Sequence, residues 1–168
     1  IKINLAPEGR SLNDLLADGQ IDGIVGLYEP SCMASGAPVK RLFPDWRSTE
    51  QYYFRRTGIF PIMHTVVIRR DVYNAHRWVA QALYKAFVEA KRRAWENYFE
   101  TAAMKYMLPW MVAHVENTMD TFGRDWWQYG FAENKETLEV FLRYHHEQGL
   151  SDRLLTPEEL FAPECLES

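Results

Sequence analysis

The residue types best suited to chemistry gather around residues 57–70, which read TGIFPIMHTVVIRR. His64 lies in this β-branched and apolar run, after Pro61, which fits a strand only at its edge, its start or a bulge. An imidazole can donate or accept a proton near neutral pH, and it can also bind a carboxylate. His64 is therefore the candidate general acid or base. The alternative is a hydrogen-bonded histidine of the core.

Acidic and basic side chains nearby suggest a ligand that carries charge. Glu29 follows a predicted strand next to a loop, where open α/β sheets place their ligands; it can equally be a loop carboxylate or a helix-cap partner. Arg55 and Arg56 can bind a dianion through forked guanidinium hydrogen bonds, although at least one of them fits a solvent-exposed face.

Neither a metal nor a cofactor is implied by the residue spacing. His145, His146 and Glu147 are adjacent on a predicted helix, so their side chains diverge and make a poor chelate. Cys32 and Cys165 lack metal-ligand spacing and are expected to be reduced thiols. The sequence contains no P-loop, no Gly-rich phosphate loop and no nucleophile elbow. The aromatic run at residues 126–130 either walls a ligand pocket or packs beneath a helix connection.

Composition excludes several classes of function. The net charge of -4 and the pI near 5.8 argue against nucleic-acid binding, which needs clustered surplus Lys and Arg. The apolar runs fall short of the roughly 20 residues that span a bilayer. A reduced, cytoplasmic protein is the default expectation.

The elements that must position these residues begin with a strand at 1–5, a helix capped by Ser11 and ended by Gly19, and a strand at 21–27. Strand, helix and strand in so few residues predict a parallel βαβ step and an α/β fold. Because so small a unit cannot cover both faces of a sheet, we expect the remaining strands to lie upstream of Ile1.

The remaining segments predict one strand among helices. Residues 48–51 suit the start of a helix that Gly58 ends, and residues 59–68 suit a strand. Helical periodicity then begins at Asp71, with further helices from Pro109 to Gly123, from Asn134 to Gly149 and after a capping box at 156–159. Residues 1–38 are interpreted as the end of one α/β lobe with its connection. Residues 39–168 are interpreted as a crossing strand with carboxyl-terminal helices packing on the other lobe.

Several segments together resemble the 4,5-dihydroxyphthalate decarboxylase family: SL…GQID at 11–22, PSC at 30–32, VKRLFPD at 39–45, YY at 52–53, TGIFPIMH at 57–64, YKAF at 84–87, YHHEQGL at 144–150 and EELFAP at 158–163. The resemblance runs along almost the whole chain. It implies a two-lobed fold like that of type 2 periplasmic-binding proteins, with an amino-terminal half ahead of Ile1. One departure is Arg77, where relatives commonly have proline.

The resemblance also implies an activity: decarboxylation of 4,5-dihydroxyphthalate to 3,4-dihydroxybenzoate and CO2 in phthalate degradation. His64 would be the general acid, Tyr52 or Tyr53 a second proton donor or a ring contact, and an arginine such as Arg55 would hold the retained carboxylate. The alternative is a periplasmic solute-binding protein of an ABC-type transporter, since such folds also serve only to bind. Activity on another aromatic acid is a third possibility. The expected partners are a small aromatic carboxylate, the amino-terminal half and possibly further copies in a homo-oligomer.

Overall fold

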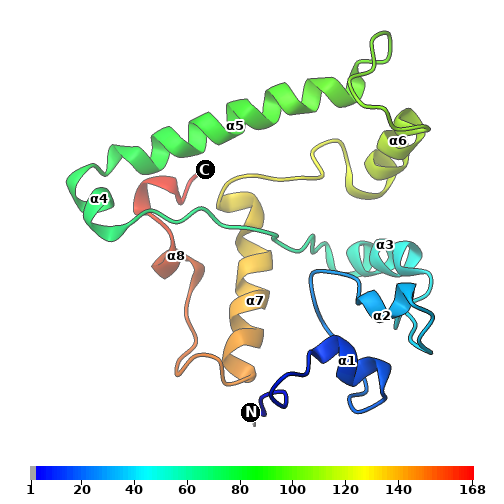
Figure 1. The fold of residues 1–168 in the computed structure, drawn as a ribbon. Coiled ribbons are helices and arrows are strands. Elements are labelled where there is room, and N and C mark those ends of the chain that lie inside the picture. The colour runs from blue at the N-terminus through cyan, green and yellow to red at the C-terminus, as the bar shows by residue number, and fades with distance from the viewer. Residues whose placement is uncertain (1–2) are drawn as a thin grey trace. The chain divides into compact units, whose positions relative to one another are not determined.

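The computed structural model describes residues 3–168, which form helices joined by irregular segments (Figure 1). Two compact units divide the chain, Ile1–Glu50 and Gln51–Ser168. The elements in chain order are α1 (Leu12–Ala17), α2 (Ser31–Ala34), α3 (Trp46–Thr57), α4 (Arg70–Ala75), α5 (Trp78–Phe99), α6 (Met111–Phe122), η1 (Ala132–Asn134), α7 (Lys135–Glu147), α8 (Pro157–Leu160) and η2 (Pro163–Cys165).

The predicted α/β, two-lobed fold is wrong, because residues 3–168 contain no strand. The segments expected as strands at 21–27 and 59–68 are irregular; of the one expected at 1–5, residues 1–2 lie outside the described residues and 3–5 are unpaired. A strand needs a neighbour to accept its backbone hydrogen bonds, and no neighbour is present in the described chain. Apolar side chains such as Val25, 107% exposed, consequently face solvent instead of the interior of a sheet.

The amino-terminal unit is built around the helix that the sequence predicts. Ser11 caps α1 through a capping box: the Asp14 amide donates to the Ser11 hydroxyl at 3.2 Å, and the Ser11 amide donates to the Asp14 carboxylate at 2.9 Å. The Ser11 hydroxyl also donates to the Asp14 carboxylate at 2.7 Å, and this bond, followed by the one from the Ser11 amide, lowers the pKa of Asp14. The Cys32 amide then donates to the Asn13 side chain at 3.0 Å, which joins α2 to α1. Leu15 and Cys32 form the small buried core of this unit.

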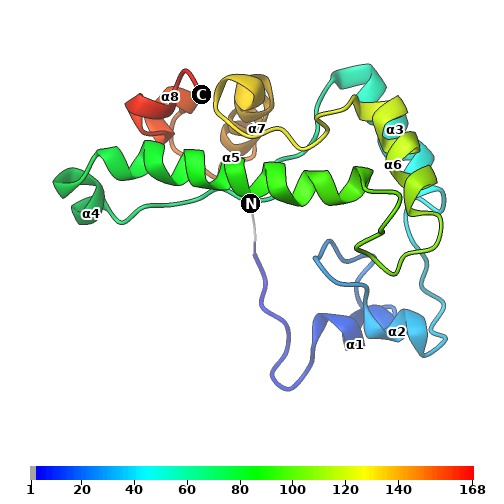
Figure 2. The ribbon, with the colours of Figure 1, turned by 90° about the horizontal axis from the view of Figure 1, so that it is seen from above.

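The carboxyl-terminal unit is organised by α5, the longest helix, which runs between α4 and the loop that leads to α6 (Figure 2). Helix α5 contacts α6 and η2, and α7 contacts η1 and α8. The helical periodicity predicted from Asp71 is interrupted at His76, where φ is -143° and ψ is 66°. The buried residues of this unit are Ala80, Met111, Val115, Phe131, Leu138, Leu142 and Pro157.

Most predicted helix ends are confirmed, but two helices start elsewhere than predicted, and one of these is α6, which begins at Met111 after an N-cap at Trp110 and not at Pro109. Helix α3 ends at Thr57 before Gly58, whose φ of 69° suits glycine, as predicted. Its start is earlier than the predicted 48–51, because the Asp45 carboxylate accepts a hydrogen bond from the Ser48 amide at 3.2 Å. At the far end, Thr156 and Glu159 form the predicted capping box, with Pro157 as the first residue of α8.

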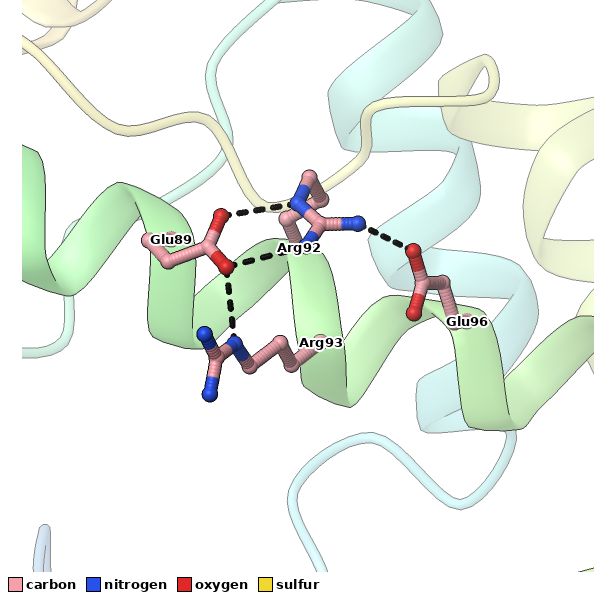
Figure 3. A network of polar contacts seen from close by, with 4 residues as sticks. All are labelled: Glu89, Arg92, Arg93 and Glu96. Carbon is pink, nitrogen blue, oxygen red and sulfur yellow. Dashed lines mark hydrogen bonds and ion pairs between the residues drawn. The ribbon is translucent and has the colours of Figure 1, made fainter.

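A network of charged side chains covers one side of α5 (Figure 3). The Glu89 carboxylate accepts hydrogen bonds from Arg92 Nε at 2.8 Å and from Arg93 Nε at 2.7 Å, and Arg92 also pairs with Glu96. The bonds from Arg92, followed by those from Arg93, lower the pKa of Glu89 to about 2. This ion-pair ladder supports α5 along a stretch that buries little apolar surface.

Acidification is expected to weaken α5 through Glu89. Its pKa falls from 4.5 to about 2 on folding, so its contribution is complete above the unfolded value and is lost as the pH falls through about 2. Glu89→Gln should therefore flatten the decline of thermal stability between these two pH values, as followed by circular dichroism. Glu116→Gln is the control, because Glu116 forms no ion pair with any described residue. Equal slopes in both variants would contradict the role of Glu89.

A close backbone contact joins the loop before η1 to the last residue. The Ala132 amide donates to the Ser168 carbonyl at 2.8 Å, and the Phe131 amide donates to the Ser168 hydroxyl at 3.3 Å. Gly130, with φ of 105°, allows this approach: a Cβ there would lie 2.7 Å from the Ser168 backbone. The carboxyl-terminal turn is thereby fixed beside the start of α7.

Gly130→Ala should accordingly destabilise the carboxyl-terminal unit. A side chain at this positive φ costs about 1–3 kcal/mol, and the clash with Ser168 adds about 1–3 kcal/mol. Gly149→Ala is the matched control, because Gly149 also has a positive φ, 70°, but a Cβ there meets nothing within 4 Å. Urea unfolding should show a clearly larger loss for Gly130→Ala; equal losses would mean that the Ser168 contact does not constrain this loop.

Candidate active site

The carboxyl-terminal unit contains an open groove of about 1430 Å³. One wall is the segment 58–68, which connects α3 to α4. The others come from α5, the loop 125–131, α7 and the residues around α8 and η2. The lining is largely apolar and aromatic, which is typical of sites for small organic ligands.

His64 lies on the wall formed by the connecting segment. Its side chain is exposed and forms no hydrogen bond with any described residue, unlike the hydrogen-bonded core histidine considered as the alternative. An exposed imidazole facing a groove is available to exchange a proton with a bound ligand.

Aromatic rings fix the start of the His64 segment. Phe60 packs edge-on against Phe122 of α6 and against Trp127, with ring centroids 5.4 and 5.5 Å apart, and Phe122 also packs on Phe54 at 4.7 Å. All four rings line the groove. They hold the chain four residues before His64 and give that end of the groove an aromatic surface.

The aromatic run at 126–130 packs beneath a helix connection and also lines the groove. Trp126 packs on Trp95 of α5 at 4.1 Å, beneath the connection from α6 to α7, while Trp127 lines the groove. Lys91 supports the run, since its ammonium lies 5.3 Å from the Trp95 ring and 5.1 Å from the Tyr129 ring. The loop 125–129 is therefore held on α5 by stacking and by a lysine between rings.

A polar cluster that the sequence analysis missed lies at the α4 end of the groove. The Tyr73 hydroxyl donates to the Glu164 carboxylate at 2.7 Å, and Arg77 donates to the Tyr73 hydroxyl at 3.1 Å and pairs with Glu164 at 2.7 Å. The bond to Tyr73 and then the charge of Glu164 raise the pKa of Arg77, while the bond from Tyr73 lowers the pKa of Glu164. In the sequence, the spacing of Tyr73 and Arg77, one helical turn apart, is the only signal that these two side chains could pair. Glu164 is 91 residues from Tyr73, so no local pattern connects it with them.

The other predicted site residues do not line this groove. Tyr52 is exposed and lies under the Arg56 guanidinium at 5.8 Å. Tyr53 is half-buried, and Arg55 is exposed. Glu29 belongs to the amino-terminal unit, where it pairs with Arg41 at 2.6 Å. Their roles in binding stay predictions.

Metal-binding side chains are not assembled in the described part of the chain. Residues 3–168 contain no group of three or more His, Cys, Asp or Glu positioned to hold an ion. His146 Nδ1 lies 3.2 Å from the Ser151 carbonyl oxygen, and the His145 ring packs near Phe141 at 5.8 Å. Both cysteines are free thiols, and burial raises the pKa of Cys165. Among the helices of the described residues, none is long and apolar enough to cross a bilayer.

Comparison with known proteins shows what the chain is similar to. No protein-family model matches the chain. A curated protein of Comamonas testosteroni named 4,5-dihydroxyphthalate decarboxylase is 44% identical over 164 residues, which are 97% of this chain and 50% of that protein. The chain is similar to a decarboxylase. The resemblance carried by the TGIFPIMH segment and its companions is thereby confirmed, and the chain spans about half the length of the Comamonas decarboxylase.

Proposed function

We propose that this chain forms about half of a decarboxylase that converts 4,5-dihydroxyphthalate to 3,4-dihydroxybenzoate and CO2 during phthalate degradation. The observation that carries the proposal is the 44% identity with the Comamonas decarboxylase, which extends over 97% of the chain. An alignment that extends over nearly the whole chain, and so over both units, favours a shared activity over a shared scaffold alone.

The reaction needs a proton at one ring carbon. The ring hydroxyls supply electron density to the carbon that bears the departing carboxylate, so that this carbon can take up a proton and form a new carbon–hydrogen bond. The carbon–carbon bond to the carboxylate then breaks, its electron pair returns to the ring, and CO2 leaves. His64 is the proposed proton donor, because it is exposed on the groove and has no competing hydrogen-bond partner among the described residues.

The groove supplies the surroundings that such a substrate requires. The rings of Phe60 and Trp127 offer an apolar surface for a benzene ring. Tyr52 or Tyr53 is proposed as a second proton donor or ring contact, Arg55 as the residue that holds the retained carboxylate, and Glu29 as a further substrate contact. The remainder of the site is proposed to come from the part of the protein that corresponds to the unmatched half of the Comamonas decarboxylase.

A direct assay tests this function. The complete protein encoded by the gene is incubated with 4,5-dihydroxyphthalate, and the products are separated by chromatography. We expect one 3,4-dihydroxybenzoate for each substrate consumed. Binding of the substrate without any turnover would instead point to a solute-binding protein, and turnover of a different aromatic acid alone would assign another substrate.

A further inference from the structure

Lys91 is a titratable residue that the proposed chemistry does not use, although its side chain is only 16% exposed. A lysine is rarely withdrawn this far from water unless its charge is compensated. Here the ammonium pairs with the Asp125 carboxylate and lies 5.3 Å from the Trp95 ring centroid and 5.1 Å from the Tyr129 ring centroid. Asp125 and Tyr129 are the first and last residues of the loop 125–129. One lysine of α5 therefore holds both ends of this loop.

The two indoles inside this loop contact different parts of the carboxyl-terminal unit. Trp126 packs on Trp95 of α5 at 4.1 Å. Trp127 lines the groove, and its ring centroid lies 5.5 Å from that of Phe60. Because packed side chains transmit displacements to their neighbours, a shift of the loop on α5 would move Trp127 relative to Phe60.

Phe60 connects the loop to the proposed proton donor. It lies four residues before His64, on the segment that forms one wall of the groove. The backbone of residues 60–68 forms no hydrogen bond with any described residue, so the packing of Phe60 on Trp127 and Phe122 anchors the start of this segment. The contacts thus run from Lys91 through the loop 125–129 and Phe60 to the His64 segment.

We propose that Lys91 is a positioning residue for the proton transfer assigned to His64. Its charge keeps the loop 125–129 on α5, and the loop in turn keeps Trp127 against Phe60 at the start of the His64 segment. The kinetic part of this inference rests on the proposed function, whereas the placement of Trp127 does not. Positioning of this kind affects catalysis strongly, because a shift of about 1 Å in the reacting groups can cost on the order of 100-fold in rate.

Kinetics of the complete protein encoded by the gene test the catalytic part, with 4,5-dihydroxyphthalate as the substrate. Lys91→Met keeps the length and the apolar stem of the side chain but removes its charge, and it should lower kcat about 10-fold or more with a smaller change in KM. Lys91→Arg keeps the charge and the contact with the rings, so it should restore kcat to within about 3-fold of the unsubstituted protein.

A second lysine of α5 provides the matched control. Lys85 is exposed, does not line the groove and forms no ion pair with any described residue, so Lys85→Met should keep full activity. A kcat of Lys91→Met as high as that of Lys85→Met would overturn the proposal. Equal losses in Lys91→Met and Lys91→Arg would overturn it too, by showing that the shape of the side chain and not its charge holds the loop.

Fluorine NMR of Trp127 separates this inference from the proposed function, because it needs no turnover. The complete protein is labelled with 5-fluorotryptophan, and the Trp127 resonance is identified by its absence in Trp127→Phe. Lys91→Met should shift or broaden this resonance, whereas Lys91→Arg and Lys85→Met should leave it in place. An unmoved resonance in Lys91→Met would overturn the positioning role even if kcat falls. A moved resonance in a protein that leaves 4,5-dihydroxyphthalate unchanged would sink the decarboxylase proposal and leave the placement of Trp127 by Lys91 intact.

Asp125→Asn gives a second variant, which removes the charge that pairs with Lys91 and leaves the lysine between its two rings. It should move the Trp127 resonance and lower kcat, each by less than Lys91→Met does. If Lys91→Met does not fold, Asp125→Asn decides both measurements, and an unmoved resonance with an unchanged kcat would overturn the proposal.

Discussion

His64→Ala is expected to reduce kcat/KM of the complete protein for its proposed substrate, 4,5-dihydroxyphthalate, by about 10²–10⁴-fold, the usual contribution of a positioned general acid. The reason is that a ring carbon must take up a proton before CO2 leaves, and among the described residues no other histidine lines the groove. The loss should appear mainly in kcat, since the imidazole acts after the substrate is bound. The rate of product formation, followed by chromatography at several substrate concentrations, gives both constants.

The structure offers a clean control for this variant. His114 is also an exposed histidine, but it lies on α6 and does not line the groove, so His114→Ala should keep full activity. Because the His64 side chain is exposed and unpaired, its removal should shift the free energy of unfolding by less than about 0.5 kcal/mol. A fully active His64→Ala variant would show that another group supplies the proton.

Phe131→Ala should destabilise the carboxyl-terminal unit by about 3–5 kcal/mol, the cost of removing a phenylalanine from a core. The Phe131 side chain is 5% exposed, and its ring packs edge-on against Phe161 at 5.4 Å, which joins the loop before η1 to the segment after α8. Its loss would leave a cavity where these two segments meet, beside the contact with Ser168. Urea unfolding of the 168-residue chain measures the change.

A second phenylalanine of the same unit provides the comparison. Phe141 on α7 is 58% exposed, so Phe141→Ala removes a ring that buries little surface in this chain. We expect its cost to stay below about 1 kcal/mol. Similar losses for the two variants would contradict the assignment of Phe131 to the core.

Local signals in the sequence predicted the helix ends well. The Ser11 and Thr156 capping boxes and the glycines after α3, α6 and α7 depend on a few neighbouring residues, and each of them is where the sequence predicted it. The shifted start of α3 has the same origin, because Asp45 can cap a helix as well as Ser48 can.

Features that depend on distant residues escaped prediction. The runs at 21–27 and 59–68 have the composition of strands, but a strand also requires a partner, and none of the described residues supplies one. The pairing of Tyr73 with Glu164 and the packing of Phe60 on Phe122 join residues far apart in the sequence, so no local pattern could reveal them. His64 could be singled out because it is a lone titratable residue in an apolar run, and its role stays a prediction. The residues around it in the groove were not.

This chain is proposed to supply the matching half of a 4,5-dihydroxyphthalate decarboxylase. Replacing the matched 164 residues of the Comamonas decarboxylase with the corresponding residues of this chain tests it most directly. We predict that the resulting chimera converts 4,5-dihydroxyphthalate to 3,4-dihydroxybenzoate and CO2 in equal amounts, and that the same chimera with His64→Ala does not. A folded chimera that binds the substrate and leaves it unchanged would contradict the claim.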